Sequence, residues 1–432
     1  MEIPAQDAAH MARAVELAGH GHGTTSPNPV VGCVVLDAAG QVVGEGFHAY
    51  AGGPHAEVVA LARAGERARG GTAYVTLEPC DHTGRTGPCS LALLEAGVAR
   101  VVIAVPDPSL KAAGGAARLR SHGVAVTSGV LGGAAERVNE EWLTYARLGR
   151  SHVTWKFAAT LDGRSAAEDG TSRWITSPEA RADVHRMRAA SDAIVAGIGT
   201  ILTDDPHLTA RPTPSERAHD GPASEGRRGD PAGGGQAAGG VTEGRFGGSA
   251  GDVAGGGVVE GRFGGSPGGS AGRGEVAGGS PEGGRRVPLR VVVDTEGRTP
   301  QSARVLDDQA PTLVAVADDA ATGLKADLLR LPRHGAGLDL RALLAELAAR
   351  EIVSVFLEGG PTLAGSFVGR GLTDRVVAYL APALLGSGPA ALGAAGVRTI
   401  GGIHRLAFDD LSLIGPDVRL IARPPTQPGR EK

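Results

Sequence analysis

The stretch GPHAEVVALARAGERARGGTAYVTLEPC, residues 53–80, decides the fold because it holds a helix followed by a strand. Apolar residues recur at helical spacing after Glu57, and the run TAYVTL at 72–77 is typical of a strand. His55 and Glu57 stand where the helical pattern begins, and Cys80 comes shortly after the strand. One α/β unit therefore carries three residues of the types that metal sites use.

The residues on both sides of this unit continue the alternation of strand and helix. Two apolar runs before His55 predict a hairpin across residues 37–40. The whole pattern predicts an N-terminal three-layer α/β domain with a mixed sheet over residues 1–149. Strands are predicted at 30–36, 41–47, 72–77, 100–105 and 123–129, and helices at 56–68 and 90–97.

A second α/β pattern follows and predicts a C-terminal domain over residues 150–432. Its clearest helix covers 177–190, with Ser177 as the N-cap and Pro178 at the first helical position. Strands are predicted at 153–163, 192–202, 289–295, 312–317, 353–360 and 374–382, with a last edge strand at 417–424.

Glycine is concentrated between residues 212 and 287, where the chain is almost entirely Gly, Ser, Ala, Pro and charged residues. The segments VTEGRFGGSAG (241–251) and VVEGRFGGSPG (258–268) form an imperfect repeat. Stacked structural repeats need apolar faces, which these segments lack. We therefore expect 212–287 to be a disordered insertion on which the function does not depend.

The composition argues against several classes of protein. The net charge of -4 offers no attraction for nucleic acid or anionic lipid, and aromatic residues make up only 3% of the chain. No run approaches the roughly 20 apolar residues that a membrane helix needs, and the N-terminal residues lack the pattern of a secretory signal. Three cysteines in 432 residues do not make a disulfide framework. These features predict a cytoplasmic protein without nucleic-acid or membrane partners.

The chain supplies two further metal ligands after His55. Cys80 follows a predicted strand, and Cys89 begins a predicted helix. One histidine nitrogen and two thiolates suit zinc, and three protein ligands leave a fourth position for water, whose pKa falls to about 7 on the metal. Glu57 is close enough in sequence to reach that water without binding the metal. We therefore predict a catalytic Zn²⁺ held by His55, Cys80 and Cys89.

Two questions about this site remain open from the residues alone. A structural zinc would need a fourth ligand, for which His48 and His82 are available, but it would leave Glu57 without a role. Cys33 lies within an apolar strand pattern, and we expect it to be buried there instead of binding the metal.

The combination of HAE, EPC and GPC resembles the zinc nucleobase deaminases, in which a histidine and two cysteines hold zinc and a free glutamate carries protons. In that family two residues usually separate the cysteines, whereas DHTGRTGP separates Cys80 from Cys89 here. This longer segment and SPNPVVGCVV at 26–35 are similar to the deaminase half of the bifunctional riboflavin-biosynthesis proteins, the RibD family. The resemblance implies a cytidine-deaminase-like fold with Glu57 as the catalytic residue. The substrate contacts it implies are Asn28, His48, His82 and Arg85.

The C-terminal half has two weak signals for a ligand site. FLEGGPTLAGSFV (356–368) is typical of a strand, a glycine turn and a helix, and Gly359 and Gly360 would let the backbone approach a phosphate. A plain structural turn explains the pattern equally well, because it is not the dinucleotide fingerprint. The segment TDDPHLTAR (203–211) places polar residues at the mouth of the predicted sheet, where α/β proteins bind ligands.

Five segments in this half resemble, in order, the reductase half of the same family, which is related in fold to dihydrofolate reductase. They are KFAATLDGR (156–164), SRWITS (172–177), TDDPHLTAR (203–211), EGGPTLAG (358–365) and APALLGSG (381–388). The resemblance implies NADPH-dependent reduction of a ribosyl group. The implied cofactor contacts are Ala158, Trp174, Thr200, Asp204, Thr295, Gly360, Pro361, Thr362, Leu363, Ala364, Gly365 and Ser366. The implied substrate contacts are Lys156, Ser172, Arg188, Leu208, Arg211 and Glu358.

The leading hypothesis is a two-domain enzyme that deaminates a pyrimidine ribosyl phosphate and then reduces its ribose with NADPH. The resemblance also implies a homo-oligomer. The alternative is a zinc deaminase of RNA or a free nucleobase with a C-terminal binding module, against which the low charge and few aromatics argue. A second alternative treats the first domain as a structural zinc site and the whole chain as a reductase or an interaction protein.

Overall fold

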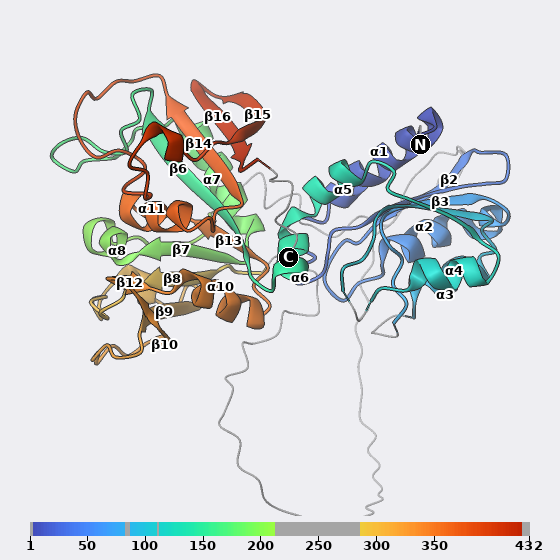
Figure 1. The fold of residues 1–432 in the computed structure, drawn as a ribbon, viewed down its shortest axis with the longest axis horizontal. Coiled ribbons are helices and arrows are strands. Elements are labelled where there is room, and N and C mark those ends of the chain that lie inside the picture. The colour runs from blue at the N-terminus through green and yellow to red at the C-terminus, as the bar shows by residue number, and fades with distance from the viewer. Residues whose placement is uncertain (1–2, 83–86, 110–111, 212–285, 426–432) are drawn as a thin grey trace, which may run out of the picture. The chain divides into compact units, whose positions relative to one another are not determined.

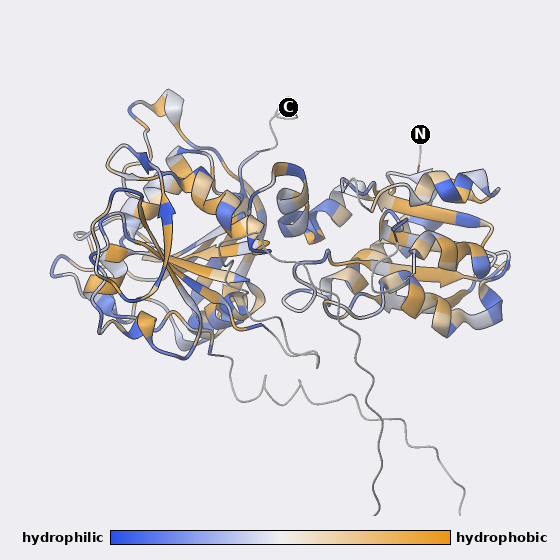
Figure 2. Cartoon of the chain, turned by 90° about the horizontal axis from the view of Figure 1, so that it is seen from below, coloured by the Kyte–Doolittle hydropathy of each residue, from blue (hydrophilic) through white to orange (hydrophobic). Residues whose placement is uncertain are grey.

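Figure 1 shows the computed structural model of the chain, which describes residues 3–82, 87–109, 112–211 and 286–425. Arg85 and nearly all of the insertion predicted at 212–287 lie outside the described residues. Most strands of the described part belong to one sheet of five strands or to another of nine. Figure 2 shows that the strands of both sheets are mostly hydrophobic, while hydrophilic residues gather on helices and loops.

The first sheet is mixed, with the strand order β2-β1-β3-β4-β5. β1 pairs antiparallel with both β2 and β3, whereas β3, β4 and β5 run parallel. The predicted hairpin and the five predicted strands are therefore confirmed. The strands are β1 (Gly32–Leu36), β2 (Val42–Phe47), β3 (Thr72–Leu77), β4 (Arg100–Val105) and β5 (Ala125–Ser128).

Helices cover both faces of the first sheet, which confirms the predicted three layers. Alternate residues of β1 enter two apolar clusters, one shared with α2, α3 and α4 and the other with α1 and α5. A Cβ on Gly32 would lie 2.0 Å from the Ala14 carbonyl oxygen of α1, so only glycine allows this close packing. The helices are α1 (Ala5–Gly19), α2 (Ala56–Ala64) with a 3-10 turn (Gly65–Ala68), α3 (Cys89–Glu95), α4 (Gly115–Ser121), α5 (Gly132–Val138) and α6 (Glu140–Leu148).

The second sheet has the order β10-β9-β8-β7-β13-β6-β14-β16-β15. In this order, the strands β10, β9, β8, β7, β13, β6 and β14 all run parallel to their neighbours. β16 is antiparallel to β14, and β15 is antiparallel to β16 at the edge of the sheet. Strands buried on both faces need continuous apolar runs, as in β9. The strands are β6 (His152–Thr160), β7 (Ala193–Gly197), β8 (Leu289–Val293), β9 (Thr312–Ala317), β10 (Asp327–Leu331), β13 (Ser354–Leu357), β14 (Arg375–Ala381), β15 (Ala407–Ile414) and β16 (Asp417–Arg423), beside a small pair, β11 (Arg333–His334) and β12 (Gly337–Leu338).

The helices around the second sheet begin where the sequence marks them. The Ser177 side chain accepts a hydrogen bond from the Ala180 N–H, which confirms the predicted N-cap of α7. Gly360 is the residue before α11, at the end of the glycine turn that follows β13. The helices are α7 (Pro178–Ala190), α8 (Ile198–Asp204), α10 (Leu340–Ala349) and α11 (Pro361–Gly369), with 3-10 turns at Arg304–Leu306 and Ile400–Gly402.

One strand prediction for this half of the chain is wrong in part. The apolar run 192–202 predicts a single strand, but β7 ends at Gly197 and α8 begins at Ile198. Ile198 and Ile201 are both buried and stand three residues apart, which is the spacing of a helix face. An uninterrupted apolar run could not distinguish the two elements.

The strand predicted at 417–424 is present as β16, but it does not lie at the edge of the sheet. β15 pairs with its outer side through a hairpin at Gly415, whose φ of 60° suits glycine. Asp409 and Asp410 interrupt the apolar alternation of β15, so the sequence pattern did not reveal this strand.

Within the described ranges, every helix is too short or too polar to span a lipid bilayer.

Candidate functional site

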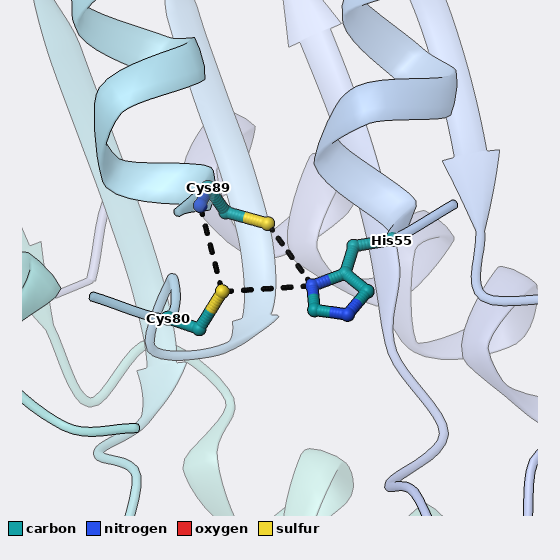
Figure 3. Close-up of side chains that lie close together, drawn as sticks. All are labelled: His55, Cys80 and Cys89. Atoms are coloured by element: carbon teal, nitrogen blue, oxygen red, sulfur yellow. Dashed lines mark hydrogen bonds between the residues drawn. The ribbon is translucent and has the colours of Figure 1, made fainter. Parts of the chain in front are cut away.

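Three side chains from three elements meet beside the first sheet. His55 is the residue before α2, Cys80 follows β3, and Cys89 is the first residue of α3. Their ligand atoms all lie within 4.8 Å of one another (Figure 3). His55 Nδ1 is 3.2 Å from Cys89 Sγ and 3.5 Å from Cys80 Sγ. This set of donors fits one zinc ion held by one nitrogen and two sulfurs.

The local hydrogen bonds of Cys80 and Cys89 suit their sulfur atoms to binding a cation. Pro88 enters α3 with an extended backbone, so the N–H of Cys89 is free of the helix and donates to Cys80 Sγ at 3.4 Å. The hydrogen bond between the two thiol groups lowers the pKa of Cys80 and raises the pKa of Cys89. The sulfurs therefore share a proton, which binding of a cation would release.

Glu57 lies in the first turn of α2 and is only 3% exposed. Burial raises the pKa of its carboxyl group, while the charge of His55 and a hydrogen bond with Cys89 act in the opposite direction. The Glu57 carboxyl group is therefore close enough to interact electrostatically with His55, Cys80 and Cys89. A carboxyl group with a raised pKa beside a metal site is suited to carry protons.

The hydrogen bonds of His48 occupy both of its ring nitrogens. Nδ1 lies 3.0 Å from the Pro54 carbonyl oxygen, and Nε2 lies 3.2 Å from Asn28 Nδ2. Because a carbonyl oxygen only accepts, Nδ1 carries the proton and Nε2 accepts from the Asn28 amide. Burial lowers the pKa of His48, which keeps the ring neutral. The structure thus joins two residues predicted to contact substrate, and His48 orients the amide group of Asn28.

The other residues that the sequence analysis considered near this centre are His82, Arg85 and Cys33. His82 is exposed, two residues beyond Cys80, and Arg85 is among the residues outside the described ranges. Cys33 is fully buried in β1, as predicted, and burial raises the pKa of its thiol. Among the described residues, no fourth His, Cys, Asp or Glu joins the cluster. A closed structural zinc site would therefore lack a ligand from this part of the chain.

A second cluster forms where β6 continues past the end of β13. Leu357 is opposite Trp155, so Glu358 comes level with Lys156. The Glu358 carboxylate lies 3.6 Å from Lys156 Nζ and accepts a 2.6 Å hydrogen bond from Arg188 Nε. Burial alone would raise the pKa of Glu358, but the charges of Arg188 and Lys156 outweigh it and lower the pKa. Glu358 is therefore a buried anion between two cations, and its side chain is only 8% exposed.

His185 extends this cluster toward the segment at 203–211. Its Nδ1 accepts a 3.2 Å hydrogen bond from the Arg211 N–H, and Arg188 Nη1 donates to the Thr209 carbonyl oxygen at 3.3 Å. Burial and the nearby charge of Arg188 lower the pKa of His185 to about 4, so the ring is neutral at pH 7. The sequence analysis did not identify His185. The available signal was its place three residues before Arg188, on the same face of α7.

Ser172, Arg211 and Leu208 are also predicted to bind the substrate of the C-terminal domain, and they differ in how exposed they are. Ser172 is half-buried in the loop before α7, and the Arg211 side chain is exposed. Leu208 has a φ of 50°, and its side chain is packed in the core of the second sheet. Only the backbone of Leu208 can therefore face a ligand, whereas the prediction did not distinguish backbone from side chain.

The predicted cofactor turn lies at the beginning of α11. Gly360 precedes the helix and Pro361 is its first residue, so the next N–H groups are unpaired within the helix and can meet an anion. A Cβ on Gly360 would lie 3.8 Å from Thr200 Oγ1, which places Thr200 beside the turn. Farther along the helix, Ala364 and Gly365 are buried in packing contacts. The first turn of α11 is therefore the part suited to a phosphate, with Thr362 and Leu363 supplying the N–H groups.

The remaining predicted cofactor residues come from several elements. Trp174 is 69% exposed in a loop, and the guanidinium of Arg181 lies 4.4 Å above its ring. The Asp204 carbonyl oxygen accepts a hydrogen bond from Arg173 at 3.2 Å. Exposed aromatic and polar groups of this kind can contact a nucleotide. Ala158 and Thr295 are half-buried, in β6 and after β8, and the Ser366 hydroxyl donates to the Thr362 carbonyl oxygen.

Comparisons with known proteins match both parts of the chain. Residues 4–105 match the cytidine and deoxycytidylate deaminase zinc-binding region, and residues 151–420 match the RibD C-terminal domain. The riboflavin biosynthesis protein RibD of Escherichia coli strain K12 is 38% identical over 424 residues, covering 96% of this chain and 98% of the relative. RibD of Mycobacterium tuberculosis strain H37Rv is 39% identical over 419 residues, covering 96% of each chain.

Solved structures agree with these matches. RibD of Acinetobacter baumannii has a TM-score of 0.73 at 33% identity and covers 98% of this chain and 99% of its own. A diaminohydroxyphosphoribosylaminopyrimidine deaminase/5-amino-6-(5-phosphoribosylamino)uracil reductase of Thermotoga maritima has a TM-score of 0.71 at 28% identity, with 97% and 99% coverage. With a zinc-binding deaminase domain and an NADPH-dependent reductase domain in one chain, this protein belongs to the RibD family of bifunctional riboflavin biosynthesis enzymes.

Proposed function

We propose that residues 1–149 and 150–432 catalyse two consecutive reactions of riboflavin synthesis. The first is hydrolytic deamination of 2,5-diamino-6-(5-phosphoribosylamino)pyrimidin-4-one to 5-amino-6-(5-phosphoribosylamino)uracil. The second is NADPH reduction of the ribosyl side chain of that product to ribityl. The observation that carries the proposal is the meeting of His55, Cys80 and Cys89 beside the buried carboxyl group of Glu57.

In the proposed deaminase reaction, Glu57 moves protons between water and the departing amine. Zinc, when bound, supplies the Lewis acid that makes the attacking water acidic. Glu57 would take a proton from this water and give it to the ring nitrogen as the C–O bond forms. It would then take the proton of the new hydroxyl group and give it to the amine, which leaves as ammonia when the C–N bond breaks. The raised pKa of its carboxyl group suits both directions of transfer. Asn28, held by His48, would bind the edge of the pyrimidine, and His82 and Arg85 would contact the remainder of the substrate.

In the proposed reductase reaction, the cluster of Lys156, Arg188 and Glu358 binds and orients the sugar for hydride transfer. NADPH, when bound, supplies the hydride. The sugar must present its C1 as an imine or open-chain aldehyde, and the adjacent heteroatom must be protonated as the hydride arrives. Lys156 is our candidate donor, because it carries a proton beside Glu358 and burial lowers its pKa. Arg188 and Arg211 would bind the sugar phosphate.

The cofactor would lie along the carboxyl ends of the parallel strands. The first turn of α11, from Gly360 to Leu363, offers N–H groups to its phosphates, and Thr200 lies beside that turn. Trp174 offers an exposed ring for a flat group of the nucleotide. The preference for NADPH over NADH follows the family.

The test of this function is Glu57→Gln in the full-length enzyme. Deaminase kcat should fall by about 10²–10⁴, the contribution of general acid–base catalysis. Zinc content and reduction of the deaminated intermediate should be unchanged. Glu45→Gln is the matched control, since Glu45 is a carboxylate of the same domain that pairs with Arg13. Unchanged deamination in Glu57→Gln would remove this residue from the mechanism and favour a structural zinc.

We also propose that the enzyme is cytoplasmic, acts only on small molecules and forms a homo-oligomer. The net charge of -4 supports the absence of nucleic-acid and anionic-membrane partners. Phe408, Leu411 and Leu413 of edge strand β15 are 71%, 67% and 71% exposed, a pattern that a second copy could cover. Light scattering coupled to gel filtration should show an assembly, and Leu411→Lys should weaken it.

A further inference from the structure

The two sulfur ligands come from different elements and are far apart in sequence. Eight residues separate Cys80 from Cys89, and only Cys89 belongs to a helix. A loose connection of this length would let the two thiolates move apart, and metal binding would then have to order the segment as well. The affinity of the site for zinc therefore depends on what fixes the distance between these ligands before the metal binds.

The residues that directly follow the two cysteines are joined to each other. Ser90 Oγ donates a hydrogen bond to Asp81 Oδ1 at 2.6 Å, and the Ser90 N–H donates to the Cys80 carbonyl oxygen at 3.2 Å. Ser90 is fully buried, and the side chain of Asp81 is 20% exposed. The two hydrogen bonds thus close a short ring made of the Cys80 carbonyl group, Asp81 and Ser90, and Ser90 is bonded directly to Cys89.

Asp81 is also held in place by a third part of the domain. Its N–H donates to the Ala112 carbonyl oxygen at 2.9 Å, and Arg118 of α4 forms an ion pair with its carboxylate. The backbone hydrogen bond therefore fixes the position of Asp81, and Arg118 is a second, partly exposed partner of its carboxylate. Ser90 in turn moves with Cys89, because the two residues are adjacent in the first turn of α3.

We propose that Asp81 and Ser90 are positioning residues of the deaminase site. Their hydrogen bond holds the sulfurs of Cys80 and Cys89 at the separation that zinc binding requires. This inference rests on the proposed zinc ligands, and both residues act through those ligands without binding the metal. The Asp81–Ser90 bond takes the place of a shared helix, which would fix the two cysteines if they lay closer in sequence.

The primary test is the zinc dissociation constant of the full-length enzyme, measured by competition with a chromophoric chelator. Asp81→Ala and Ser90→Ala should each bind zinc about 10–100-fold more weakly, the usual effect of losing a group that orients a metal ligand. Asp81→Asn keeps an oxygen that accepts from Ser90 and should stay within about threefold of the wild type.

Arg118→Ala is the matched control, because it removes the other partner of the same carboxylate and leaves the Asp81–Ser90 bond intact. It should also stay within about threefold, as expected for a partly exposed ion pair. The double variant Asp81→Ala/Ser90→Ala should bind zinc no more weakly than the weaker single variant, since both changes break one bond. Unchanged reduction of the deaminated intermediate would show that the rest of the chain is folded.

The Co²⁺-substituted enzyme gives a readout of ligand geometry that a general loss of stability would not produce. The thiolate charge-transfer and d–d bands should shift in Asp81→Ala and Ser90→Ala and remain at wild-type positions in Asp81→Asn and Arg118→Ala. Wild-type zinc affinity in both alanine variants, or an equal loss in Arg118→Ala, would overturn the proposed positioning role. Full zinc retention in Cys80→Ser would instead overturn the proposed ligands themselves.

Discussion

Replacing Glu358 by glutamine should destabilise the reductase domain, because it removes a buried negative charge and leaves two cations unneutralised. Glu358 is 8% exposed, and its partners Lys156 and Arg188 are 17% and 21% exposed. The substitution keeps the size of the side chain, so packing around it should change little. The effect therefore isolates electrostatics from cavity formation.

The expected magnitude follows from the two interactions that are lost. The hydrogen bond from Arg188 at 2.6 Å is charge-assisted and contributes about 1.5–3 kcal/mol. The ion pair with Lys156 is longer, at 3.6 Å, and adds up to about 1 kcal/mol. The glutamine oxygen still accepts a neutral hydrogen bond, which recovers about 1 kcal/mol. A net loss of about 2 kcal/mol at pH 7 remains, which corresponds to a Tm about 4–8 °C lower for a domain of this size.

The assay is thermal unfolding of the variant and the wild type over a range of pH. Folding lowers the pKa of Glu358, so its contribution is complete above the ordinary value of 4.5 and is lost as the pH falls through the lower folded value. The difference between the two proteins should therefore shrink in acid. Glu346→Gln is the control, because Glu346 pairs with Arg350 on the surface and should cost less than about 0.5 kcal/mol. Equal stability at pH 7, or a difference that grows in acid, would refute the reasoning.

Three further outcomes are expected. Cys80→Ser and Cys89→Ser should each lose zinc in metal analysis, whereas Cys33→Ser should retain it, since Cys33 is buried in β1 and outside the cluster; a zinc-free Cys33→Ser would contradict this. Between pH 6.5 and about 4 the reductase domain should lose stability as the pH falls, because folding lowers the pKa of His185 and the unfolded chain binds the proton first. Urea unfolding of His185→Gln should show a smaller pH dependence in that window, and an identical one would exclude His185 as the cause. Deleting residues 214–285 should leave both activities within about a few-fold, because the free energy of loop closure depends weakly on length; collapse of reductase activity in this variant would show that the segment matters.

The positions that could be predicted are those governed by local pattern. Strands β3, β4 and β9 have the predicted bounds, because each is a short apolar run between turn residues. The helix at 177–190 was equally clear, since Ser177 and Pro178 determine where it begins. The candidate metal ligands could be predicted because His55, Cys80 and Cys89 each stand at the end of such an element, where side chains from different elements can meet.

The features that could not be predicted depend on long-range contacts. Nothing local distinguishes β7 from α8 within one apolar run, and β15 became a strand only through its pairing with β16. The hydrogen bond between His48 and Asn28 joins residues 20 positions apart, and Arg188 and Glu358 are 170 apart. Sequence spacing does not determine which of many polar residues will meet at such distances.

The sequence alone therefore determined most of the strands, the layered α/β folds and the candidate residues of the zinc centre, because side-chain periodicity and turn chemistry act over a few residues. Tertiary structure alone decided the orientation of Asn28, the burial of Glu358 between two cations and the bond that links Asp81 to Ser90. These depend on how elements pack, since hydrogen-bond geometry and desolvation are properties of the assembled site.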